Sequence, residues 1–172
     1  MTNYSFRPGR MDAAVTDNNG LSRVTALLDS EKPTLLVTMH PECRCSVATV
    51  SEMQRISDEC GGQLRMVAIF ADYETLPVAA EKCGLWKKAA RVTGVQPILD
   101  SDGSLRSELK AATSGESFLF SPSGEIIYHG GITSARGHEG ASSGGDAVIT
   151  YYRKHLPSLA TAPVFGCNLD DR

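Results

Sequence analysis

Short apolar runs alternate with stretches of helical periodicity along this chain. Residues 34–39 and 63–70 are continuous runs of apolar and β-branched side chains, which is typical of buried strands. Between them, Val47, Val50 and Met53 recur every three residues, which indicates an amphipathic helix. This order predicts a strand–helix–strand unit with parallel strands and a right-handed crossover.

The second half of the chain predicts further strands and helices. The sequence ESFLFSPSGEIIYHGG indicates two strands around a Pro-Ser-Gly turn, which is a β-hairpin. Pro97 interrupts the short apolar run 95–100 and predicts a strand at an edge or irregular position. We expect a mixed sheet of four or five strands with helices on both faces. Helical patterns cover residues 21–28, 73–92, 103–112 and 146–156.

The two ends of the chain differ in character. Residues 1–20 are polar and rich in Asn, Asp and Gly, and we expect them to be extended or disordered. Residues 21–172 predict a single domain, because no repeat or linker divides them. The tail carries Val164, Phe165 and Leu169, which gain nothing in water, so it should fold back onto the domain with Phe165 as its anchor.

Length and charge exclude several classes of protein. A chain of 172 residues is long enough for one sizeable core. The net charge of −3 and the absence of a basic run argue against a nucleic-acid surface. The sequence contains neither an apolar window of about 18 residues that could span a membrane nor a signal peptide. We expect a cytoplasmic protein or, where an export or anchor segment has been removed, a periplasmic or membrane-anchored one.

The five cysteines do not form a disulfide scaffold, because their number is odd and they are scattered. Cys60 and Cys83 stand near predicted helix ends, as expected of half-buried, inert thiols. Cys43 and Cys45 differ because they form a pair in HPECRCSVA, between a predicted strand and a predicted helix. The free N–H groups and positive dipole of a helix start stabilise a thiolate there.

Two neighbours of this pair are candidates for supporting roles. Arg44 adds a positive charge between the two cysteines. His40 stands at the end of the predicted strand and helps to shape the loop. A thiolate in this setting is both the nucleophile of disulfide exchange and a ligand for soft metals.

The strand, cysteine pair and helix, together with the hairpin SFLFSPSGEII, resemble the thioredoxin-like superfamily over residues 30–160. The segments HPECRCSVA, TSGESFLFSPSGEIIYHGGITSARGHEG and PVFGC together resemble its RedB-like branch, whose members often follow a membrane anchor. The resemblance implies a thioredoxin-like α/β fold and a thiol–disulfide oxidoreductase with Cys43 and Cys45 as catalytic residues. It implies no required cofactor, and protein thiols, protein disulfides or a redox protein as partners.

The sequence departs from the superfamily pattern in two places. Cys43 and Cys45 have one residue between them rather than two, and a disulfide across one residue is more strained and easier to reduce. Such a pair suits an oxidant or an isomerase better than a strong reductant. Gly115 stands where the superfamily has a cis-proline, and we expect a trans bond or a positive φ there, since a non-proline cis bond costs about 3 kcal/mol. This change weakens the case for ordinary substrate binding and leaves room for a metal.

The alternative function is that of a copper or other soft-metal protein on the same fold. Two thiolates are too few for a closed site, so further ligands are needed. His138 lies with Arg136 in the Gly-rich loop 130–145, which should face the cysteine pair because the preceding strand runs toward that end. A third hypothesis is an interaction module without redox activity.

Cys167 has two interpretations. Docking of the tail could bury it as an inert thiol. The same docking could instead bring it near Cys43 and Cys45, as a resolving thiol or a third soft ligand.

Overall fold

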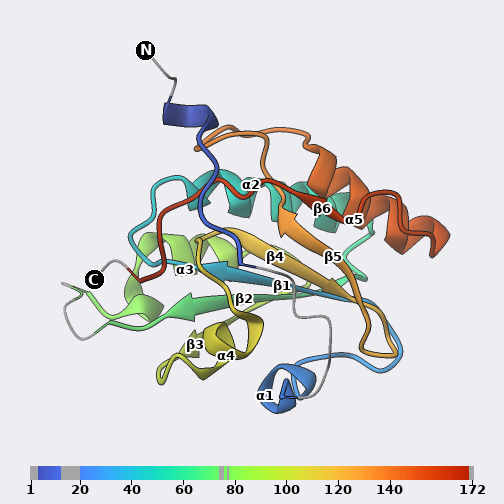
Figure 1. Cartoon of the computed structure of the whole chain (residues 1–172), viewed down its shortest axis with the longest axis horizontal. Coiled ribbons are helices and arrows are strands. Elements are labelled where there is room, and N and C mark those ends of the chain that lie inside the picture. The colour runs from blue at the N-terminus through green and yellow to red at the C-terminus, as the bar shows by residue number, and fades with distance from the viewer. Residues whose placement is uncertain (1–3, 13–19, 74–75, 77, 171–172) are drawn as a thin grey trace.

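The computed structural model describes residues 4–12, 20–73, 76 and 78–170 of the chain. Its centre is a six-stranded mixed sheet with the strand order β3-β2-β1-β4-β5-β6 (Figure 1). The strands are β1 (Thr34–Met39), β2 (Arg65–Ala71), β3 (Val95–Asp100), β4 (Glu116–Phe120), β5 (Ile126–Gly131) and β6 (Thr161–Ala162).

Helices cover both faces of this sheet, as predicted (Figure 1). The side chains of α2, α3 and α5 form the larger core with one face, and those of α1 and α4 form a smaller core with the other. The two cores follow from alternation along β1, where Leu35 and Val37 face the first and Leu36 faces the second. The helices are η1 (Tyr4–Phe6), α1 (Ser22–Thr25), α2 (Ser46–Glu59), η2 (Ala80–Lys82), α3 (Gly84–Ala89), α4 (Ser104–Leu109) and α5 (Ser143–Lys154).

The predicted strand–helix–strand unit and hairpin are both confirmed. Strand β1 pairs in parallel with β2 across helix α2, and β4 pairs antiparallel with both β1 and β5. Strand β3, which contains Pro97, lies at one edge of the sheet, as predicted. Proline has no N–H to donate, and an edge strand tolerates this because it pairs with a neighbour on one side only.

Two sequence-based expectations were wrong. The sheet has six strands rather than four or five, because Thr161–Ala162 pair in parallel with β5. The single helix expected over 73–92 is instead the short η2 followed by α3. The break lies at Cys83, whose backbone is extended and whose thiol caps α3 by accepting the N–H of Trp86 at 3.3 Å. Pro77, which the prediction placed near the helix start, lies outside the described residues.

The tail folds back onto the sheet, as its apolar residues predicted. Val164, Phe165 and Leu169 are all buried. The N-terminal segment runs beside it, and the N–H of Gly9 donates to the carbonyl of Val164 at 2.7 Å (Figure 1). Leu169 is more deeply buried than Phe165, so the tail has two anchors rather than one.

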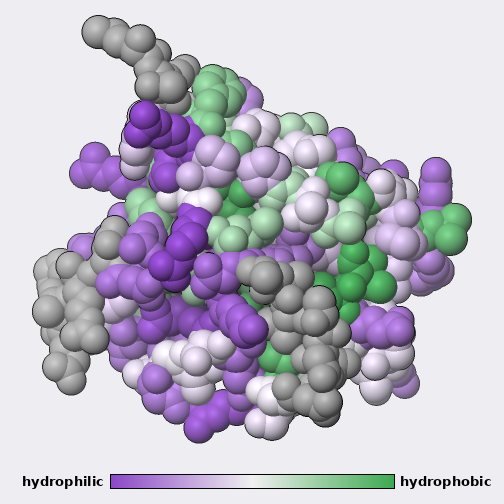
Figure 2. Space-filling model, viewed as in Figure 1, coloured by the Kyte–Doolittle hydropathy of each residue, from purple (hydrophilic) through white to green (hydrophobic). Residues whose placement is uncertain are grey.

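The surface has a mixed character. On the face shown in Figure 2, hydrophilic and hydrophobic residues are interspersed. The most exposed large apolar side chains include Tyr4 and Phe6 near the N-terminus and Leu156 after α5. Among the described residues, no helix is long and apolar enough to cross a membrane.

Candidate thiol site

The cysteine pair lies where β1 passes into α2. The strand ends at Met39, and α2 begins at Ser46 with Cys45 as its N-cap residue. Cys43 precedes that residue in the turn, so the predicted position of both cysteines at a helix start is confirmed. The loop before β4 lies alongside, because the N–H of Gly115 donates to the carbonyl of Thr38 in β1 at 2.6 Å.

Three thiols meet at this place. The sulfur atoms of Cys43, Cys45 and Cys167 all lie within 4.8 Å of one another. Cys43 is buried, whereas the other two are partly exposed. The backbone N–H of Cys167 donates to the sulfur of Cys43 at 3.4 Å, although 124 positions separate them in the chain.

The tail reaches Cys43 by pairing with the loop before β4. The N–H of Ser114 donates to the carbonyl of Cys167 at 2.8 Å, and the N–H of Leu169 donates to that of Ala112 at 2.8 Å. Thr113 and Asn168 form an antiparallel bridge between these two bonds. The tail therefore adds a short strand segment to the loop, and that pairing fixes the position of Cys167.

A glycine makes this close approach feasible. A Cβ on Gly166 would overlap the carbonyl oxygen of Ser114, so no larger residue fits without moving the tail. The guanidinium of Arg136 donates to the carbonyl of Gly166 on the other side. Gly166 is therefore held from both directions, directly before the cysteine.

The far end of the tail has a second clamp. The carbonyl of Leu169 accepts hydrogen bonds from the hydroxyl of Tyr73 and from Arg106, the latter at 3.1 Å. The ring of Tyr73 stacks on that of His40, with 4.8 Å between the ring centroids. His40 thus contributes to the site by supporting a residue that holds the tail.

Ser114 connects the cysteine turn with the loop before β4, to which the tail is paired. Its hydroxyl lies 2.7 Å from the hydroxyl of Ser46 and accepts the N–H of His40 at 2.8 Å. Sequence reasoning missed both serines. A signal exists in hindsight, because Ser114 directly precedes Gly115, the residue that marks this loop.

Gly115 has φ of +90°, which agrees with the positive φ expected there. The described residues contain no cis peptide bond, so the loop reaches the site without one. A Cβ at Gly115 would lie 3.0 Å from the hydroxyl oxygen of Thr49, so any larger residue would be both strained and crowded.

The buried carboxylate of Glu116 holds the loop before β4 in place. One carboxylate oxygen of Glu116 accepts the N–H groups of Ala112 and Thr113, at 2.9 and 3.2 Å. The other lies 2.6 Å from Nε2 of His129, and both side chains are buried. The sequence contained a signal for this pair, because an acid and a histidine stand on facing strands of the predicted hairpin.

The loop after β5 contributes Arg136 but not His138 to this group. Burial raises the pKa of Cys45, and Arg136 lies close enough to hydrogen-bond its sulfur and to oppose that rise. His138 is exposed and is not part of the group of three thiols. Arg44 is also exposed, although it stands between the two cysteines in sequence.

The three thiols differ in their affinity for a proton. Burial acts most strongly on Cys43 and would raise its pKa, but hydrogen bonds from Cys167 and Ser46 outweigh burial and lower it. Burial, and then the charge of Cys43, raise the pKa of Cys45, while Arg136 opposes them. Burial and the hydrogen bond to Cys43 raise the pKa of Cys167 to about 12. Of the three thiols, Cys43 is therefore the one that gives up its proton most readily.

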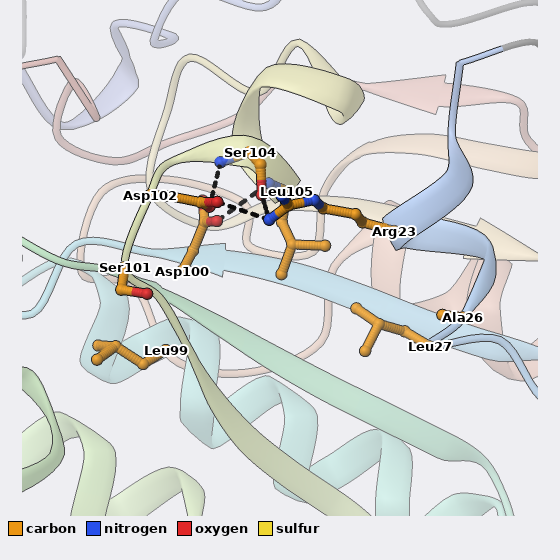
Figure 3. Close-up of a pocket in the computed structure, with 9 residues that line it drawn as sticks. All are labelled: Arg23, Ala26, Leu27, Leu99, Asp100, Ser101, Asp102, Ser104 and Leu105. Carbon is orange, nitrogen blue, oxygen red and sulfur yellow. Dashed lines mark hydrogen bonds and ion pairs between the residues drawn. The ribbon is translucent and has the colours of Figure 1, made fainter.

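A separate pocket opens between α1 and the end of β3 (Figure 3). Its charged side chains are already paired, since Arg23 bonds Asp102 at 2.6 Å and Ser104 at 2.7 Å. Asp100 accepts hydrogen bonds from α4, including that from the N–H of Leu105 at 3.0 Å. These contacts explain the pocket as the junction of α1 with α4, and none of the three clustered cysteines lines it.

Comparison with known proteins identifies the fold. No family model and no curated protein matches the chain. A solved hypothetical protein from Sinorhizobium meliloti is 24% identical, with a TM-score of 0.69 over 87% of this chain and 84% of that one. An uncharacterized conserved protein from Geobacillus kaustophilus is 17% identical, with a TM-score of 0.68 over 97% and 93%.

A third solved structure is that of an exposed lipoprotein thioredoxin from Streptococcus pneumoniae. It is 14% identical, with a TM-score of 0.51 over 72% of this chain and 84% of that one. The chain has a thioredoxin-like α/β fold, as its sequence predicted. Its assignment to the RedB-like branch stays a prediction.

Proposed function

We propose that the protein carries out thiol–disulfide exchange at Cys43 and Cys45 and acts as an oxidant of protein thiols. The observation that supports this most is the setting of the Cys43 sulfur. It is buried, accepts an N–H from the tail, and lies beside two partly exposed thiols. An oxidant needs a reduced form that is stabilised, and these hydrogen bonds stabilise a Cys43 thiolate.

Burial determines the direction of attack. In a disulfide between Cys43 and Cys45, an incoming partner thiolate meets the partly exposed sulfur of Cys45 rather than the buried one of Cys43. It forms a mixed disulfide there and releases Cys43 as the thiolate, a good leaving group because it is stabilised. A second thiolate of the partner then displaces Cys45, which takes up a proton. The partner loses two electrons as its dithiol becomes a disulfide, and the cysteine pair gains them.

The partner is then a protein with two thiols, and the pair is reloaded by exchange with another disulfide. The thioredoxin-like fold supports this partner class, and the name of the pneumococcal neighbour, an exposed lipoprotein, supports a site outside the cytoplasm. We therefore place this function in the periplasm, with the chain soluble there or attached to the membrane by a preceding segment. Disulfides persist in that compartment.

Single-turnover oxidation of a reduced protein tests this function. The protein is oxidised with glutathione disulfide, freed of it, and mixed with a reduced, unfolded protein that has two cysteines. Disulfide formation in that protein should be fast and should vanish in Cys43→Ser. Cys83→Ser is the matched control, because serine keeps the helix cap that Cys83 provides. Equal rates with and without the chain would exclude the function.

The three sulfurs also support a second candidate, a site for Cu(I) or another soft metal. Thiolates prefer such ions, and the sulfurs of Cys43, Cys45 and Cys167 are already close together. Anaerobic competition against a Cu(I) chelator tests this. Binding should weaken in Cys167→Ser and stay unchanged in His138→Ala, since His138 lies outside the group. Binding no tighter than that of a variant without the three thiols would exclude a metal role.

A further inference from the structure

Cys43 has two sulfur neighbours that approach it from different parts of the fold. Cys45 belongs to the same turn, with one residue between it and Cys43, and Cys167 is brought in by the paired tail. Only one of them can form a disulfide with Cys43 at a time. The surrounding backbone distinguishes the two.

Cys45 belongs to a turn that hydrogen bonds already constrain. The carbonyl of Cys43 accepts the N–H of Ser46 at 3.1 Å, and that of Cys45 accepts the N–H of Ala48 at 3.2 Å. Cys45 itself has helical φ and ψ of −65° and −29°. A disulfide across the single residue between them needs both Cβ atoms to converge, and this would disturb the first turn of α2.

Cys167 approaches the same sulfur from outside the first turn of α2. Its N–H and its thiol both hydrogen-bond the sulfur of Cys43. Its backbone is fixed on either side, by Arg136 at Gly166 and by Ser114 at its own carbonyl. Because no Cβ fits at Gly166, the tail packs tightly against the loop directly before Cys167. The contact between these sulfurs is therefore built into the fold.

We propose that Cys167 is a catalytic residue, and that the oxidised protein carries a disulfide between Cys43 and Cys167 while Cys45 stays a thiol. This inference rests on the proposed exchange function and changes the disulfide that performs it. A disulfide-bearing partner or a small-molecule disulfide loads the site, accepting two electrons and two protons from the two thiols. The loaded site oxidises the next dithiol.

In the transfer step, a substrate thiolate attacks the partly exposed sulfur of Cys167. The bond from Cys167 to Cys43 breaks, Cys43 leaves as the thiolate, and a mixed disulfide joins Cys167 to the substrate. The second substrate thiolate then attacks the substrate sulfur of that bond. Cys167 leaves and takes up a proton, and the substrate keeps the new disulfide.

Peptide mapping of the oxidised full chain tests the pairing directly. Trypsin cleaves after Arg44 and so separates Cys43 from Cys45. The chain is oxidised with glutathione disulfide, its remaining thiols are alkylated, and it is digested and analysed by mass spectrometry. We expect the Cys43 peptide linked to the peptide that begins at His155 and contains Cys167, with Cys45 alkylated. Cys45→Ser should keep this link, and Cys167→Ser should lose it.

The outcomes separate this inference from the function on which it rests. A link between the Cys43 and Cys45 peptides, with Cys167 alkylated, would overturn the inference while leaving exchange at the cysteine pair intact. A Cys167→Ser variant that oxidises a reduced protein as fast as the parent would do the same. Failure of all three cysteines to form any disulfide would overturn both. Cys83→Ser should match the parent in every measurement.

Discussion

The carbonyl oxygen of Ser114 occupies the space that a Cβ on Gly166 would need. This contact determines how closely the tail can approach the loop before β4. It also explains why a glycine directly precedes Cys167, since any side chain would separate the tail from the loop. The position of the Cys167 thiol thus depends on Gly166, a residue without a side chain.

Gly166→Ala should therefore displace the tail without removing a thiol. We expect a loss of about 1 to 3 kcal/mol in the free energy of unfolding, the usual range for strain in a packed position. Cys43 should also react faster with an alkylating reagent, because the tail covers it. Gly84→Ala is the control, since open space surrounds Gly84 at the start of α3 and alanine favours a helix. Unchanged stability and unchanged reactivity of Cys43 would contradict this account.

Leu169→Ala tests the other end of the tail. Leu169 is fully buried, and removal of a buried leucine side chain typically costs about 2 to 5 kcal/mol. Chemical denaturation should show a loss in this range, with Leu159→Ala as a control because Leu159 is exposed. A loss no larger than that of the control would show that the tail contributes little to stability.

The sequence predicted the local parts of this site better than the distant ones. Cys43 and Cys45 could be placed at a helix start because the strand, turn and helix are continuous in sequence. The docking of Phe165 and Leu169 followed from their apolar character. The proximity of Cys167 to Cys43 depends on the pairing of Ser114 with the tail, and no periodicity in the sequence predicts such a pairing.

The loop after β5 shows the same limit in another form. Strand direction correctly predicted that this loop faces the cysteines, and Arg136 does reach them. The same argument could not tell which side chain of the loop points inward. Arg136 turns toward the tail and its carbonyl at Gly166, whereas His138 points into solvent.

The acid–base behaviour of Cys43 gives a pH prediction. Hydrogen bonds lower its pKa, while the pKa of Cys167 is raised to about 12. Thiolate absorbance of the reduced protein, compared with that of Cys43→Ser, should therefore show a group whose midpoint lies below that of the same protein's cysteines in denaturant. A difference curve centred at or above that value would contradict the prediction.

The same shift has a consequence for stability. The thiolate of Cys43 stabilises the folded state above the unfolded pKa, and this stabilisation is lost as the pH falls through the lower folded pKa. The free energy of unfolding of the reduced protein, relative to that of Cys43→Ser, should therefore be higher at alkaline pH than at acidic pH. Denaturation of both proteins across this range measures the difference, and a difference that stays constant with pH would exclude the linkage.

Arg136→Gln tests the charge that acts on the partly exposed thiols. Burial raises the pKa of Cys45 and Arg136 opposes that rise, so its removal should raise the pKa of Cys45 further and slow its alkylation at neutral pH. Arg44→Gln is a demanding control, because Arg44 is adjacent to both cysteines in sequence but is exposed. A larger effect from Arg44→Gln than from Arg136→Gln would reverse the assignment of the charge.

Glu116→Ala tests whether the buried acid maintains the loop that holds the tail. The substitution removes the acceptor for two loop N–H groups and the partner of His129, all buried. A buried donor left without an acceptor costs about 1 to 3 kcal/mol, and we expect a loss of at least that order. Glu116→Gln should cost less, because an amide oxygen can still accept the loop N–H groups.

The role of Glu116 at the site also requires a second measurement, since any buried substitution can lower stability. In Glu116→Ala the loop should loosen at Ala112 and Thr113, which lie directly opposite the tail, whereas Glu116→Gln should keep these residues in place. Alkylation of Cys167 in Glu116→Ala under native conditions should therefore become faster, whereas alkylation of Cys83, which is outside the site, should not change. Glu125→Gln, in the exposed turn of the same hairpin, should alter neither rate. Equal acceleration at Cys167 and Cys83 would indicate general loosening of the fold rather than support of the tail by Glu116.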